Sequence, residues 1–152
     1  MQNHTKFWLL IIICLGLIGI GISGYLTYEH FRGTLPTCKI SYLPFLDNCG
    51  QVLGSKYAQI GPLPTAMLGL FYYIFIFIST NYLLIFPQKL TPHIKTIYLL
   101  IDSVAALISI ILVYLQLFVL HAICPYCMLS AFTTFAIFFT TLKIRRLPTQ
   151  PA

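Results

Sequence analysis

Two cysteines in the last third of the chain have the spacing of a redox or metal-binding pair. Cys124, Pro125, Tyr126 and Cys127 form the sequence C-P-Y-C at the junction of two long apolar segments. If Cys124 caps the second segment, Pro125 occupies the first helical position, where its missing N–H costs nothing. Cys127 then lies in the same turn, and both sulfurs meet backbone N–H groups and a helix dipole that favour the thiolate. The spacing therefore predicts a dithiol that exchanges electrons.

The composition indicates that the segments on either side of this pair lie in lipid. The chain has 152 residues, of which 59% are hydrophobic and 8% are charged, a composition far from that of soluble domains. One domain is expected at this length. The formal charge of +6 does not indicate nucleic-acid binding, because the basic residues occur in ones and twos without a basic stripe.

Four apolar segments predict four membrane crossings. The first has 22 uncharged residues, which as a helix span about 33 Å and cross a hydrocarbon core of about 30 Å. A retained helix is favoured over a signal peptide because the stretch is long and no A-x-A-like site follows. We expect an all-α membrane protein, a four-helix bundle forming one domain over 1–146 with a tail at 147–152. The expected helices are about 7–28, 65–86, 96–120 and 124–142.

A long polar connection, 29–64, separates the first two segments and carries Cys38 and Cys49. Residues 47–56 could form a short amphipathic helix at the membrane surface. A loop of this length without a domain of its own is usually functional.

The basic residues set the orientation. Four crossings place both termini on one side, together with the turn at 87–95. That side holds six Lys and Arg residues and the other side holds three. The asymmetry places the termini in the cytoplasm, with the long loop and C-P-Y-C on the opposite face, where disulfides persist.

The four cysteines on that face admit three interpretations. They could form static structural disulfides, as a membrane scaffold would use, or a zinc site, although ten residues separate Cys38 from Cys49 whereas zinc knuckles are tight. The third interpretation is a relay in which two dithiol pairs exchange electrons and a membrane quinone accepts them. Cys14, alone within the first segment, is expected to be a small buried apolar residue.

Two further polar residues could take part in chemistry. Asp102 is costly in lipid, and we expect a structural hydrogen bond to Ser103 or to another helix. His121, three residues before Cys124, could donate a proton or stabilise a thiolate, although an interfacial histidine is more often only solvated.

Several motifs, in order, resemble the vitamin K epoxide reductase family in its bacterial form. They are N-C-G-Q-V-L-G-S at 48–55, I-G-P-L-P at 60–64 running into Gly69, Y-L-Q at 114–116 and I-C-P-Y-C at 123–127. The resemblance extends from the first apolar segment to about Leu142. The other bacterial disulfide-generating membrane family has its C-x-x-C in the first exported loop, the reverse of the order here.

The resemblance implies a bacterial inner-membrane enzyme that reoxidises a separate thioredoxin-like, DsbA-type exported protein and reduces ubiquinone or menaquinone, without a metal. Cys38 would accept electrons from that protein and Cys49 would pass them to Cys124. Cys127 would lie nearest the quinone and reduce it. The loop pair has a wider spacing than bacterial members show.

The resemblance also implies residues around the quinone. Ser55 would lie near the pocket, and Val52 and Leu53 would cover it if the loop folds over the bundle. Thr65 and Ala131 match the positions of the quinone-binding Asn and Tyr of the animal enzymes, so specificity for vitamin K epoxide is not expected.

Overall fold

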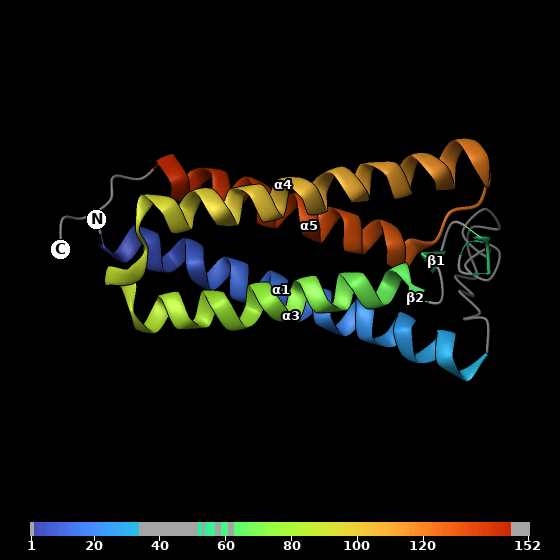
Figure 1. The fold of residues 1–152 in the computed structure, drawn as a ribbon, viewed down its shortest axis with the longest axis horizontal. Helices are drawn as coiled ribbons and strands as arrows, with labels where there is room; N and C mark the ends of the chain where they lie inside the picture. The colour runs from blue at the N-terminus through green and yellow to red at the C-terminus, as the bar shows by residue number, and fades with distance from the viewer. Residues whose placement is uncertain (1, 34–51, 53, 57–58, 61–62, 147–152) are drawn as a thin grey trace.

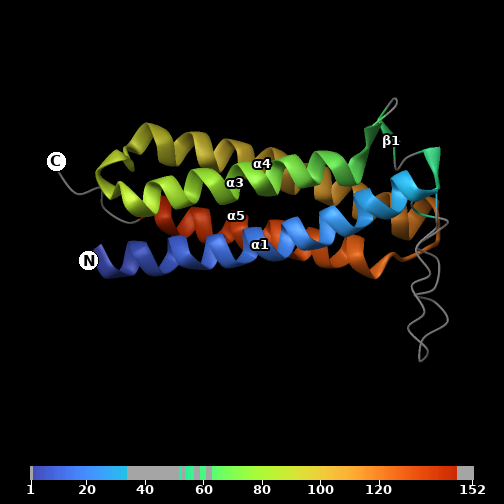
Figure 2. The same cartoon turned by 90° about the horizontal axis from the view of Figure 1, so that it is seen from below.

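The computed structural model describes residues 2–33, 52, 54–56, 59–60 and 63–146. Four long helices run side by side along one axis (Figures 1 and 2): α1 (Gln2–Arg32), α3 (Thr65–Ile85), α4 (Pro92–Tyr114) and α5 (Pro125–Arg146). All four are long and apolar enough to cross a membrane. The start of α1, the end of α5 and the α3–α4 turn lie at one end of the bundle, and the start of α5 lies at the other (Figure 1). The predicted all-α membrane bundle is confirmed.

The helices extend beyond the apolar segments that predicted them. α1 continues through Glu29–Arg32, which the sequence assigned to the loop, and α5 continues through Lys143–Arg146. Polar residues at these ends can still form helical hydrogen bonds. Hydropathy therefore predicts the part of each helix that crosses lipid, and not where the helix begins or ends. Basic side chains in the last turn of α5 also interact favourably with its dipole.

The α3–α4 turn is shorter than predicted. It contains the 3-10 helix η3 (Pro87–Lys89), and α4 begins at Pro92 instead of at residue 96. Thr91 caps α4, because its side chain accepts a hydrogen bond from the N–H of Ile94 at 3.4 Å. A Thr-Pro pair is a helix start signal that hydropathy does not detect. Lys95 therefore lies buried in α4, at the same end of the bundle as predicted.

α4 ends in a π-helical turn, η4 (Leu115–Val119), close to the cysteine pair. The N–H of Leu120 bonds to the carbonyl of Leu115 at 2.9 Å, which closes this wider turn. π-Helical turns are rare and frequently occur at functional sites. Before α3, a two-residue antiparallel pair joins β1 (Gln59–Ile60) to β2 (Leu63–Pro64).

Helix α1 packs against α3 and α5, and α4 packs against α5. The α1–α3 contact is close because Gly19 faces the ring of Tyr73, where a Cβ on Gly19 would overlap the ring. Ser23 is buried one turn later, beside Gly69 of α3. The small residues of the first segment thus allow two membrane helices to approach closely, as such residues commonly do.

The predicted surface helix at 47–56 falls largely outside the described residues, as does the tail at 147–152. Within that segment, Ser55 bonds back to the carbonyl of Val52 through its N–H and, at 2.8 Å, through its hydroxyl.

Candidate functional site

The cysteine pair lies at the start of α5, as the sequence predicted. Cys124 immediately precedes Pro125, and its carbonyl accepts the first helical hydrogen bond, from the N–H of Met128 at 3.0 Å. The sulfur of Cys124 accepts a hydrogen bond from the N–H of Cys127 at 3.4 Å. Cys124 therefore caps the helix with its sulfur, in the place where an oxygen usually serves.

Electrostatics distinguish the two thiols. The pKa of Cys124 is lowered, first by a hydrogen bond from the Cys127 thiol and then by the backbone N–H groups of Cys127 and Tyr126, which together outweigh burial. The backbone N–H groups expected around both sulfurs thus act on Cys124. Both thiols are unbridged in this structure. The arrangement favours the thiolate form of Cys124.

A buried glutamine on η4 holds Cys124 from the other side. The Oε1 atom of Gln116 accepts a hydrogen bond from the N–H of Cys124 at 3.3 Å. The backbone carbonyl of Gln116 accepts another from the N–H of Ala122 at 3.1 Å. Sequence reasoning used Gln116 only as part of a motif. The sequence did contain a signal for its role, because Gln116 is a polar residue in an apolar segment, eight residues before Cys124.

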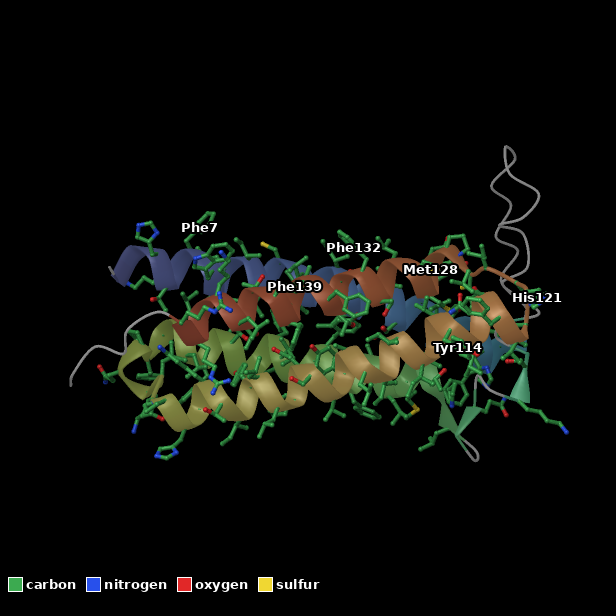
Figure 3. All side chains as sticks on the ribbon, turned by 90° about the horizontal axis from the view of Figure 1, so that it is seen from above. Phe7, Tyr114, His121, Met128, Phe132 and Phe139 are labelled. Carbon is green, nitrogen blue, oxygen red and sulfur yellow. The ribbon has the colours of Figure 1, made fainter. Side chains whose placement is uncertain are left out.

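His121 makes the turn between η4 and α5. Its φ of 48° lies in the left-handed region, and its side chain is exposed at the end of the bundle (Figure 3). The structure thus shows a turn residue facing outward.

Val52 covers the pair. Its side chain packs with Leu26 of α1, Ala122 and Cys124 in one buried cluster, in which Cys124 is 0% exposed. Val52 belongs to the polar connection between α1 and α3. Some of that connection therefore folds over the mouth of the bundle, as expected if it shields the site from water.

Below this cover, a cavity of about 240 Å³ extends into the bundle between all four helices. Cys127 lies in its wall, whereas Cys124 lies behind. Three of the four residues predicted to surround a quinone, Ser55, Val52 and Thr65, also line it. Ala131, one turn after Cys127, contributes a methyl group to the same wall.

One side of the cavity faces the exterior of the bundle. Leu68 of α3 and Ile108 of α4 both line the cavity, and their side chains are 42% and 49% exposed. α3 and α4 are not among the closely packed helix pairs. In a bilayer this side faces lipid, as do exposed rings such as Phe132 and Phe139 on α5 (Figure 3).

The inner end of the cavity contains a hydrogen-bonded network. Tyr72 lines the cavity and donates to the Oδ1 atom of Asp102 at 2.9 Å, and Thr141 donates to the other carboxylate oxygen at 2.6 Å. The expectation that Asp102 bonds to another helix is confirmed. The alternative partner, Ser103, is wrong, because its hydroxyl bonds to the carbonyl of Leu99 in its own helix.

The other residues that the sequence singled out are three in the polar connection and Cys14 in α1. Cys38, Cys49 and Leu53 lie outside the described residues. Cys14 is exposed on α1, so the expectation of a buried residue is wrong. α1 is apolar on all sides, and its sequence does not show which side contacts lipid. Within the part of the chain that the structure describes, no three His, Cys, Asp or Glu side chains gather as metal ligands.

A comparison with protein families agrees with this arrangement. The sequence model of the vitamin K epoxide reductase family matches residues 10–142. The chain belongs to the vitamin K epoxide reductase family. A search of curated proteins finds no match. The matched region runs from within α1 to the last turn of α5 and contains both cysteines of the C-P-Y-C pair.

Membership in the vitamin K epoxide reductase family implies oxidoreductase activity. The four crossing helices make this chain a multi-pass membrane protein. Members of this family generally act on quinone-type substrates and work with thioredoxin-like partners.

Proposed function

We propose that this protein reoxidises a thioredoxin-like protein and transfers the electrons to a membrane quinone, which drives disulfide formation. The observation that carries the proposal is the position of Cys127 in the wall of a cavity that reaches the lipid-facing side of the bundle. A lipid-dissolved acceptor could enter between α3 and α4 without crossing water. Cys124, which caps α5 and accepts a hydrogen bond from the N–H of Cys127, supplies the second thiol.

The shape of the cavity suits a quinone headgroup. Its volume of about 240 Å³ lies below the roughly 300–1,000 Å³ of pockets for drug-sized ligands, as expected for a headgroup of one ring or two fused rings. Its wall combines apolar side chains with a few polar groups. The isoprenoid tail would leave past Leu68 and Ile108 into the bilayer. Ubiquinone and menaquinone both fit this description.

The electron balance closes with two dithiol pairs. A quinone accepts two electrons and two protons to become a quinol. Oxidation of Cys124 and Cys127 to a disulfide supplies both electrons. Two thiols also supply both protons, and where Cys124 is a thiolate, the second proton comes from water. Cys49 then attacks that disulfide, and Cys38 resolves the mixed disulfide as the loop pair becomes oxidised. The oxidised loop pair accepts electrons from a separate DsbA-type protein through Cys38.

The cover over the site supports transfer from the loop. Val52 packs against Cys124, and Cys49 precedes Val52 by three residues, which span about 11 Å at most when extended. A disulfide needs Cα atoms within about 7 Å of each other. The chain between Cys49 and Val52 is therefore short enough for Cys49 to reach Cys124 in the proposed transfer.

We propose the orientation that the charge asymmetry indicates. Six of the nine Lys and Arg residues belong to the end of the bundle that holds both termini. That end would face the cytoplasm of a bacterial cell, and the cysteine end would face the exported DsbA-type partner.

Purified protein in lipid nanodiscs, with a dithiol donor and a short-chain ubiquinone, would test the proposal. Cys124→Ala and Cys127→Ala should each abolish quinone reduction with any donor. Cys38→Ala should abolish it with a protein donor but retain part of it with dithiothreitol, which can attack further along the relay. A thiol count that does not change when quinone is added would instead support a scaffold with structural cysteines.

A further inference from the structure

Gln116 is the polar side chain best placed to act on a quinone beside Cys127. Its side chain is buried and lines the cavity, on a π-helical turn that departs from regular α4 geometry. Among the described residues that line the cavity, it alone carries an amide. Its oxygen bonds to the N–H of Cys124, whose sulfur in turn bonds to Cys127. A headgroup contacting Gln116 would therefore lie beside the redox pair.

Three hydroxyls that line the cavity, those of Ser55, Tyr72 and Tyr73, already donate elsewhere. Each hydroxyl has one hydrogen to donate. Ser55 donates it to the carbonyl of Val52 at 2.8 Å, Tyr72 to Asp102 at 2.9 Å and Tyr73 to the carbonyl of Ser130 at 2.8 Å.

The amide of Gln116, unlike these hydroxyls, still has hydrogens to donate. Its oxygen accepts from the backbone of Cys124, which turns its NH₂ group away from that N–H and leaves two N–H bonds as donors. A quinone carbonyl is an acceptor without a hydrogen, and negative charge develops on its oxygen as electrons arrive. A donor fixed beside that oxygen stabilises the developing charge.

We propose that Gln116 binds the quinone headgroup, donating from Nε2 to a quinone carbonyl while its Oε1 holds the N–H of Cys124. The inference rests on the proposed function and assigns a further substrate-binding residue to it. One side chain then sets the distance between the carbonyl and the helix start that carries both thiols. Gln116 transfers no electron and no proton, because the cysteine pair supplies the electrons and the amide keeps its hydrogens.

Gln116→Leu removes the donor at nearly constant volume. The matched control is Asn81→Leu, which removes an amide that bonds within α3 to the carbonyl of Phe77, away from the cavity lining. With dithiothreitol and a short-chain ubiquinone, Gln116→Leu should lower kcat/KM for the quinone by about 10- to 100-fold. The control should stay within about 2-fold of the unmodified protein, as expected for a substitution remote from the site.

A second readout separates binding from positioning. Without quinone, dithiothreitol reduction of the Cys124–Cys127 disulfide reports only the loss of the bond from Gln116 to the N–H of Cys124. Gln116→Leu should slow this reaction much less than it slows quinone reduction. Equal slowing of both reactions would show that Gln116 only positions Cys124, and would overturn the proposal.

Infrared spectroscopy of carbonyl-¹³C-labelled quinone tests the bond directly, and its measurement on the unmodified protein does not depend on the variant folding. In the unmodified protein, one carbonyl stretch should shift to lower frequency, and in Gln116→Leu that shift should disappear. Two unshifted stretches in the unmodified protein would overturn the proposal while quinone reduction remained intact. Absence of quinone reduction in the unmodified protein would instead refute the proposed function, and this inference with it.

Discussion

The bond between Tyr72 and Asp102 joins α3 to α4 across the bundle and can be measured by a double-mutant cycle. Tyr72 donates at 2.9 Å to one carboxylate oxygen, and Thr141 of α5 donates at 2.6 Å to the other. Asp102 is 0% exposed. If the role of Asp102 is structural, its removal should weaken contacts among three helices and leave electron transfer intact.

The expected magnitudes follow from these two bonds. Tyr72→Phe removes one donor, and side-chain hydrogen bonds in membrane bundles are worth about 0.6 kcal/mol on average and about 1.7 at most. Asp102→Ala leaves two buried hydroxyls without their acceptor, at about 1–2 kcal/mol each, so about 2–4 kcal/mol of unfolding free energy should be lost. The coupling energy between the two substitutions should lie near 1 kcal/mol.

Unfolding in mixed micelles with increasing SDS, followed by the fluorescence of Trp8, would provide the free energies. Trp8 is the single tryptophan and packs against the core of the bundle. Ser103→Ala is the matched control, because its hydroxyl bonds at 2.6 Å only within α4. A coupling energy below about 0.3 kcal/mol, within the usual error of additivity, would refute the bond.

Quinone reduction by Asp102→Asn separates structure from proton transfer. The amide keeps an acceptor for Tyr72 and nearly the same shape, so activity should remain within about 3-fold of the unmodified protein, as expected for the loss of less than one hydrogen bond. A loss of 10-fold or more in a stably folded variant would contradict the structural interpretation and assign the carboxyl a role in the reaction.

Four further predictions concern the cysteines. The rate of Cys124 alkylation should rise with pH at lower values than for an ordinary thiol, and Cys127→Ala should move this profile to higher pH, because it removes the hydrogen bond that most lowers the Cys124 pKa. Under oxidising conditions a Cys38→Ala, Cys127→Ala double variant should accumulate a Cys49–Cys124 disulfide; loop fragments that separate on non-reducing electrophoresis would count against the relay. After reduction, a membrane-impermeant thiol reagent should label Cys38 in intact cells, whereas labelling only after membrane disruption would reverse the orientation. Cys14→Ala should leave quinone reduction unchanged.

The sequence by itself predicted the architecture and the redox pair. Lipid offers no hydrogen bonds to the backbone, so four long apolar segments have few alternatives to four helices. The local chemistry of C-P-Y-C was equally predictable, because a proline at the first helical position and a capping residue before it depend on neighbours in sequence. The structure shows both at Cys124 and Pro125.

The tertiary structure decided which polar groups meet and which faces contact lipid. Gln116 and Cys124 meet through a π-helical turn that hydropathy does not encode, and Asp102 bonds to Tyr72 and Thr141 across helices. Cys14 faces outward although the sequence suggested a buried position. In a membrane protein the residues facing lipid and those facing the core are both apolar, so their periodicity carries little information, and packing between helices makes the choice.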